Sequence, residues 1–110
     1  MYRLMFVILG AGLVLLAGDL NDELLTAARK GDLASVKALL QQGAMLEAKT
    51  PYGQTPLYLA AMSGREEVVA FLLDKGANAA VRDTFYKAPI LGLVLERKHY
   101  GVAKLLITRG

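Results

Sequence analysis

The chain has 110 residues, enough for one small domain, and its 55% hydrophobic and 21% charged content excludes a disordered polymer. Its net charge of +3 is too small to predict nucleic-acid binding, which needs a concentrated basic face. The lack of cysteine excludes a disulfide framework, a thiolate zinc site and a lipoprotein-type lipid anchor.

The first 18 residues have the pattern of a targeting segment. A short basic start, Met1–Arg3, precedes an uncharged run of 14 residues, Leu4–Ala17. As a helix this run would be about 21 Å long, shorter than the roughly 30 Å hydrocarbon core of a bilayer. We therefore expect residues 1–18 to be a signal peptide cut after Ala17 or Gly18. An uncleaved membrane anchor, attached through residues 4–18, is the alternative.

The rest of the chain repeats itself at a spacing of 33 residues. This shift superposes the following pairs: Ala27-Ala28 on Ala60-Ala61, Leu39-Leu40 on Leu72-Leu73, and Gly43-Ala44 on Gly76-Ala77. A third unit follows, in which Pro89 matches Pro56 at a shift of 33 but Val102–Gly110 matches Val68–Gly76 at 34. We expect the extra residue in the turn around Glu96–Tyr100.

Each unit predicts two helices joined by a short turn. The first helix is expected to begin at a capping residue, Asp22 in unit one and Thr55, before Pro56, in unit two. Gly31 and Gly64 then end it, because glycine adopts the left-handed conformation readily. In unit three the first helix is expected from Pro89 to Leu95.

Residues Gln54–Asp83, with the segment QTPLYLAAMSG and the later FLLDKGA, resemble an ankyrin repeat. The resemblance covers about residues 20–110 and implies an all-α solenoid of about three helix-turn-helix units, preceded by the N-terminal hydrophobic helix. The implied repeats are about 20–52, 53–85 and 86–110, the last incomplete, within a repeat domain of residues 19–110. Three positions depart from the family pattern: Tyr58 replaces a histidine, Ala88 the capping threonine and Tyr86 the turn glycine.

Unit three lacks the polar outer side of a terminal repeat. Both of its helices are rich in apolar residues, so we expect an uncovered hydrophobic face within residues 89–107. Either the chain is part of a longer array, or a partner or a second copy covers this face.

No catalytic constellation is recognisable. His99 is the only histidine, and as a lone residue in an inter-helix turn it is expected to be a surface or turn residue and not a catalytic base. No metal-ligand spacing and no cofactor motif is present, so the sequence predicts neither an enzyme nor a cofactor.

The resemblance instead implies a protein partner of unknown identity, held by the turn tips and the exposed side of the first helices. The residues carried over by position are Arg29, Lys30, Tyr52, Gln54, Met62, Ser63, Thr84, Phe85, Lys87 and Glu96. Tyr52, Phe85 and Tyr86 are candidate anchors, because large aromatic side chains dominate many interfaces. The alternative is that Phe85 and Tyr86 fold back over the third repeat.

The prediction is therefore an exported bacterial ankyrin-type protein that acts as a protein-binding module in the periplasm or outside the cell. Two alternatives stay open: a module tethered to a membrane by its uncleaved leader, and the regulatory front segment of a larger exported enzyme.

Overall fold

The computed structural model describes residues 10–82 and 89–109, with side chains from Leu20 onward. This part of the chain is helical, and its only strand-like pairing is an isolated bridge between Arg82 and Pro89. The helices are α2 (Gly10–Lys30), α3 (Leu33–Gln41), α4 (Pro56–Met62), α5 (Glu66–Asp74), α6 (Ile90–Glu96) and α7 (Tyr100–Arg109). The predicted all-α class is confirmed.

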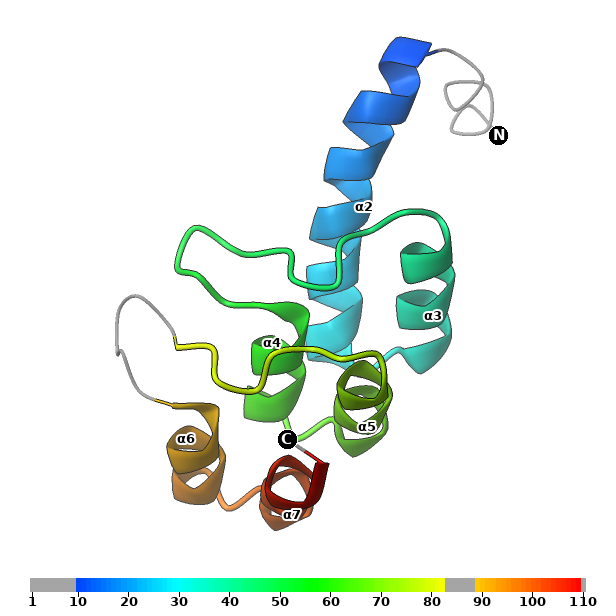
Figure 1. Cartoon of the computed structure of the whole chain (residues 1–110). Coiled ribbons are helices and arrows are strands. Elements are labelled where there is room, and N and C mark those ends of the chain that lie inside the picture. The colour runs from blue at the N-terminus through cyan, green and yellow to red at the C-terminus, as the bar shows by residue number, and fades with distance from the viewer. Residues whose placement is uncertain (1–9, 83–88, 110) are drawn as a thin grey trace.

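The helices form three hairpins, α2–α3, α4–α5 and α6–α7, that stack on one another (Figure 1). The first helices make one row, in which α2 packs on α4 and α4 on α6, and the second helices make another, in which α5 packs on both α3 and α7. Leu24, Leu57, Leu72 and Ile90 are fully buried between the hairpins. Ala28, Ala60 and Ala61 are also fully buried, and their small side chains let neighbouring helices approach closely.

Helix α2 differs from the prediction, because it begins at Gly10 and continues without a break through Asp22. The expected helix start at Asp22 is therefore wrong. The stretch from Leu13 to Asp22 contains no proline and a single glycine, so nothing in it forces the helix to end. The neighbouring Asn21 makes a contact with the following loop: its Oδ1 accepts a hydrogen bond of 2.8 Å from the Met45 amide.

In Figure 1 the N-terminal half of α2 projects beyond the stacked hairpins. Leu20, the first residue of α2 whose side chain is described, is buried. None of the helices in the described ranges is long and apolar enough to cross a lipid bilayer. Residues 1–9 of the predicted leader lie outside these ranges.

The capping pattern predicted for unit two is confirmed. Thr55 is the N-cap of α4, its Oγ1 accepts a 3.2 Å bond from the Tyr58 amide, and Pro56 occupies the first turn. Thr55 is fully buried, so this bond satisfies an amide that water does not reach. Gly31 and Gly64 have φ angles of 80° and 73°, as the inter-helix turns require.

The register of unit three corrects two predictions. Pro89 is the N-cap of α6 and Ile90 its first residue, so the helix equivalent to Pro56–Met62 is already shifted by 34 positions. The extra residue therefore precedes Pro89 and does not lie in the Glu96–Tyr100 turn. A proline fits both positions, since neither the N-cap nor the first turn needs its amide hydrogen in a helical bond. Tyr86 and Ala88 lie outside the described residues.

Lys98 occupies the turn position that Gly31 and Gly64 hold in the first two repeats, with a φ of 64°. This conformation brings the Cβ atom of an L-residue close to the backbone and costs about 1–2 kcal/mol, whereas glycine adopts it without that penalty.

We therefore expect Lys98→Gly to raise the free energy of unfolding by about 1 kcal/mol, measured by urea denaturation. Arg97, whose φ is −83°, is the matched control. Arg97→Gly should lower the free energy of unfolding. Glycine relieves no strain at this φ angle, and it loses more backbone conformational entropy on folding than arginine does. A loss of stability in Lys98→Gly would contradict this account of the turn.

Candidate protein-interaction surface

Tyr52 projects from the tip of the loop that joins the first two hairpins. The residue is 59% exposed, whereas hydrogen bonds hold the backbone around it. Thr50 Oγ1 accepts bonds of 3.2 Å from the amides of both Tyr52 and Gln54, and the Gly53 amide donates to the Thr50 carbonyl at 2.9 Å. Gln54 is half-buried, and its Oε1 accepts a 3.3 Å bond from the Thr50 hydroxyl. An exposed aromatic ring is thus carried on a pre-ordered loop, which limits the entropy lost on binding.

A second group of predicted residues meets at the C-terminal ends of α4 and α6. Met62 and Glu96 line a pocket of about 210 Å³ together with Leu93 and Arg97. The pocket has an apolar side from Met62 and Leu93 and one charge of each sign from Glu96 and Arg97. Such a surface suits an apolar side chain flanked by polar groups.

A contact between the inter-helix turn of one repeat and the helix end of the preceding repeat recurs along the stack. Arg65 Nε donates to the Arg29 carbonyl at 3.0 Å, and His99 Nε2 lies 3.2 Å from the Met62 carbonyl oxygen. Arg65 and His99 occupy equivalent positions, one residue after the left-handed residue of the turn. His99 lies in the turn, as predicted, and its ring connects repeat three to repeat two.

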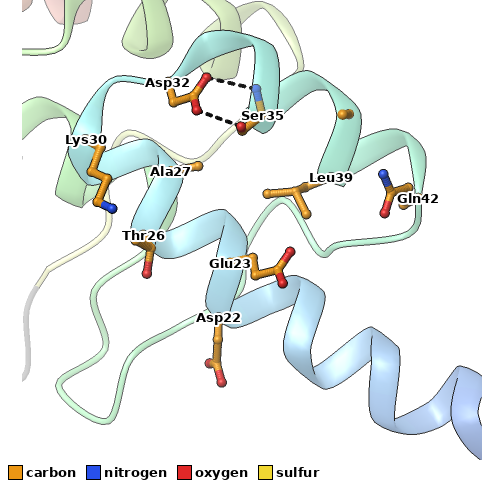
Figure 2. A pocket seen from close by; sticks show the side chains of 10 residues that line it. Asp22, Glu23, Thr26, Ala27, Lys30, Asp32, Ser35, Leu39 and Gln42 are labelled. Carbon is orange, nitrogen blue, oxygen red and sulfur yellow. Dashed lines mark hydrogen bonds between the residues drawn. The ribbon is translucent and has the colours of Figure 1, made fainter. Parts of the chain in front are cut away.

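A different surface lies on the outer side of the first hairpin. An open groove of about 530 Å³ runs between α2 and α3, and Figure 2 shows the side chains that line it. Its charged residues are Asp22, Glu23, Asp32 and Lys30. The predicted residue Lys30 therefore faces this groove and does not join Met62 and Glu96.

Asp32 caps α3 at the edge of the groove. Its carboxylate accepts bonds from the Ser35 hydroxyl at 2.7 Å and the Ser35 amide at 3.1 Å, drawn as dashed lines in Figure 2. These two bonds stabilise the charged form and lower the pKa of Asp32, with a further contribution from nearby Lys30.

Because this pKa is lowered in the folded state, the cap stabilises the protein above the ordinary carboxyl pKa and loses its effect as the pH falls through the folded value. Asp32→Asn keeps a capping oxygen but does not titrate. We expect the difference in urea midpoint between the wild type and this variant to shrink as the pH falls from neutral to about 3. A difference that stays constant with pH would show that the carboxylate charge plays no part.

The remaining predicted residues are placed as follows. Arg29 is exposed at the end of α2, and Ser63 is the half-buried C-cap of α4. Thr84, Phe85 and Lys87 lie outside the described residues, so whether Phe85 is an anchor stays a prediction. Sequence reasoning missed Leu93 and Arg97. The equivalence of Arg97 to Ser63 at a shift of 34 was the available signal for one of them.

A family model described as ankyrin repeats (3 copies) matches residues 13–83, more than half of the chain. The chain belongs to the ankyrin-repeat family. The match begins inside the segment predicted as a leader, in agreement with the continuity of α2. Ankyrin repeats act as protein–protein interaction modules, so this ankyrin chain has the fold of a module that binds other proteins.

The ankyrin chain is similar to parts of much longer proteins, each named ankyrin repeat, SAM and basic leucine zipper domain-containing protein 1. The mouse protein is 43% identical over 60 residues, which cover 54% of this chain and 13% of the relative. The proteins of Mustela putorius furo and Neofelis nebulosa are 41% and 39% identical over 66 residues, which cover 60% of this chain and 14% of each relative. The matched part of the ankyrin chain thus spans about an eighth of these relatives.

Proposed function

We propose that this ankyrin chain is a non-catalytic scaffold that binds a protein partner through the loop tip at Tyr52 and the pocket formed by Met62, Leu93, Glu96 and Arg97. The exposed Tyr52 ring on its ordered loop is the observation that supports this most directly. A large aromatic side chain that loses little freedom on binding is a typical energetic centre of an interface. The pocket adds apolar area and one charge of each sign for specificity.

The proposal is tested by affinity capture from the native source, followed by titration of the purified partner. Tyr52→Ala should weaken binding at least tenfold, because it removes the anchor. Tyr100→Ala is a matched control: this tyrosine is equally exposed, at 63% against 59% for Tyr52, but lies at the start of α7. Tyr52→Ala should leave the helical circular dichroism unchanged. Equal binding by the two variants would contradict the role of the tip.

We further propose that the chain acts after export, to the periplasm or outside the cell, directed by residues 1–18. The basic start and the short uncharged run support this. A form that stays tethered through residues 4–18 is the second candidate. It is favoured by one observation, the unbroken passage of α2 across the expected cut after Ala17 or Gly18.

The mass of the chain recovered from its native source separates these forms. A chain that starts at Gly18 or Asp19 would establish cleavage. The full-length mass in a membrane fraction would establish the tether, and the full-length mass in the cytosol would contradict both.

A further inference from the structure

The outer face of repeat three carries apolar residues at positions whose equivalents in repeat two are buried. In repeat two, Leu57, Ala61 and Leu73 are at most 9% exposed. Their equivalents at a shift of 34 are Leu91, Leu95 and Ile107. Leu95 and Ile107 are 44% and 68% exposed, and Leu91 is partly buried. The predicted apolar face is thus present but narrower than residues 89–107, because Ile90, Val94, Val102 and Leu106 are buried.

The groove on the outer side of repeat one is the counterpart of this face. At a shift of 33, its residues Asp32, Ala38 and Leu39 correspond to Arg65, Phe71 and Leu72. Two of these contact repeat one: Arg65 Nε donates to the Arg29 carbonyl, and the Phe71 ring lies 5.5 Å from the ammonium group of Lys37. The third, Leu72, is fully buried. The outer side of repeat one therefore corresponds to the side of repeat two that contacts the preceding repeat. The outer side of repeat three corresponds to the side of repeat two that contacts the following repeat.

The turn residues at the two ends also complement each other in size. Inside the stack, a long side chain lies over the turn glycine of the preceding repeat. A Cβ atom on Gly31 would lie 2.7 Å from Arg65 Cδ, and one on Gly64 would lie 2.8 Å from His99 Nδ1. At the two ends of the stack the sizes are reversed. In repeat three the turn position holds Lys98 in place of glycine, and in repeat one the position of Arg65 and His99 holds the short Asp32.

The two ends are also complementary in charge. The groove on repeat one carries three carboxylates, Asp22, Glu23 and Asp32, and one ammonium group, Lys30. The outer face of repeat three carries the exposed Lys98 and Lys104, and the positions equivalent to Glu66 and Asp74 hold the uncharged Tyr100 and Thr108. The outer face of repeat three is thus basic and apolar, and the groove on repeat one is acidic.

We propose that a second copy of this chain docks head to tail, the outer face of repeat three of one copy entering the groove between α2 and α3 of the next. Lys98 then pairs with Asp32 across the junction, and Leu91, Leu95 and Ile107 lose their contact with water. The interface uses two different patches of each copy, so a docked pair still offers one free patch at each end, and further copies can add in a row. It is independent of the partner surface at Tyr52.

Charge exchange tests the junction by sedimentation velocity of the full chain over a range of concentrations. The wild type should form species that grow beyond dimers and dissociate as salt is raised. Lys98→Asp alone, and Asp32→Lys alone, should each weaken association at least tenfold, because each places like charges across the junction. An equimolar mixture of the two variants should associate as the wild type does. Association through the leader would respond to neither change.

A variant that keeps the α3 cap guards against misfolding of Asp32→Lys. Ala38 is exposed on α3 and lines the groove, so Ala38→Arg fills it without touching the cap. This variant should stay monomeric, whereas Ala80→Arg, at an exposed loop position, should associate normally. A monomeric wild type, growth that stops at a dimer, or association that Ala38→Arg and the charge exchanges leave unchanged would each overturn the proposal.

Discussion

Leu57→Ala should lower the free energy of unfolding by about 3 kcal/mol, because it leaves a cavity at a fully buried position between α4 and its neighbours. Leu91 is the same residue type at the equivalent position of repeat three, but it is only partly buried. Leu91→Ala should therefore cost about 1 kcal/mol. Because a stack of three short hairpins is marginally stable, the larger loss should leave much of the Leu57→Ala chain unfolded near body temperature.

Urea unfolding followed by far-ultraviolet circular dichroism measures both changes. The comparison is made at low protein concentration, where a second copy does not cover Leu91. Raising the concentration should then increase the cost of Leu91→Ala if copies dock through repeat three, while the cost of Leu57→Ala changes little. Equal losses for the two variants at low concentration would show that Leu91 is as well packed as Leu57.

Sequence reasoning was reliable where the physical cause is local. Thr55 before Pro56 specifies a helix start by side-chain capping, and Gly31 and Gly64 specify left-handed turns. The repeated pairs of alanine and leucine identified the helices that pack on one another. These features act within a few residues of each other, so the sequence of one repeat is enough to predict the two helices and the turn of that repeat.

The errors arose where several local solutions are compatible with the same residues. Asp22 can cap a helix, but it can also lie within one, and the residues before it decide which. Pro89 suits both the N-cap and the first turn of a helix, so the sequence left the register of repeat three open by one position. Lys98 adopts the glycine conformation although its side chain does not favour it.

The candidate surface was only partly predictable, for a related reason. Met62 and Glu96 could be assigned to it because they end equivalent helices, and the structure brings them together in one pocket. The assignment of Lys30 to the same surface used the same logic, but within the described residues no hairpin covers the outer side of α2 and α3. Its side chain therefore faces the open groove between α2 and α3.

Gly64→Ala should lower the free energy of unfolding by about 3 kcal/mol, since two separate costs combine at this turn. The φ angle of 73° disfavours any residue with a Cβ atom, and a Cβ there would lie 2.8 Å from Nδ1 and 2.9 Å from Cε1 of His99. Gly76 isolates the first cost, because its φ is 91° but no atom lies within 4 Å of the added Cβ position. Gly76→Ala should therefore cost only about 1 kcal/mol.

A double-mutant cycle assigns the excess to the contact between repeats. His99→Ala removes the ring that lies 3.2 Å from the Met62 carbonyl, and with it the obstacle to a Cβ atom on residue 64. In that background Gly64→Ala should cost about 1 kcal/mol, close to the value for Gly76→Ala. Strictly additive losses would mean that the turn is strained by its backbone alone. A coupling of about 2 kcal/mol would instead show that glycine is needed at this position so that the His99 ring of repeat three can lie over it.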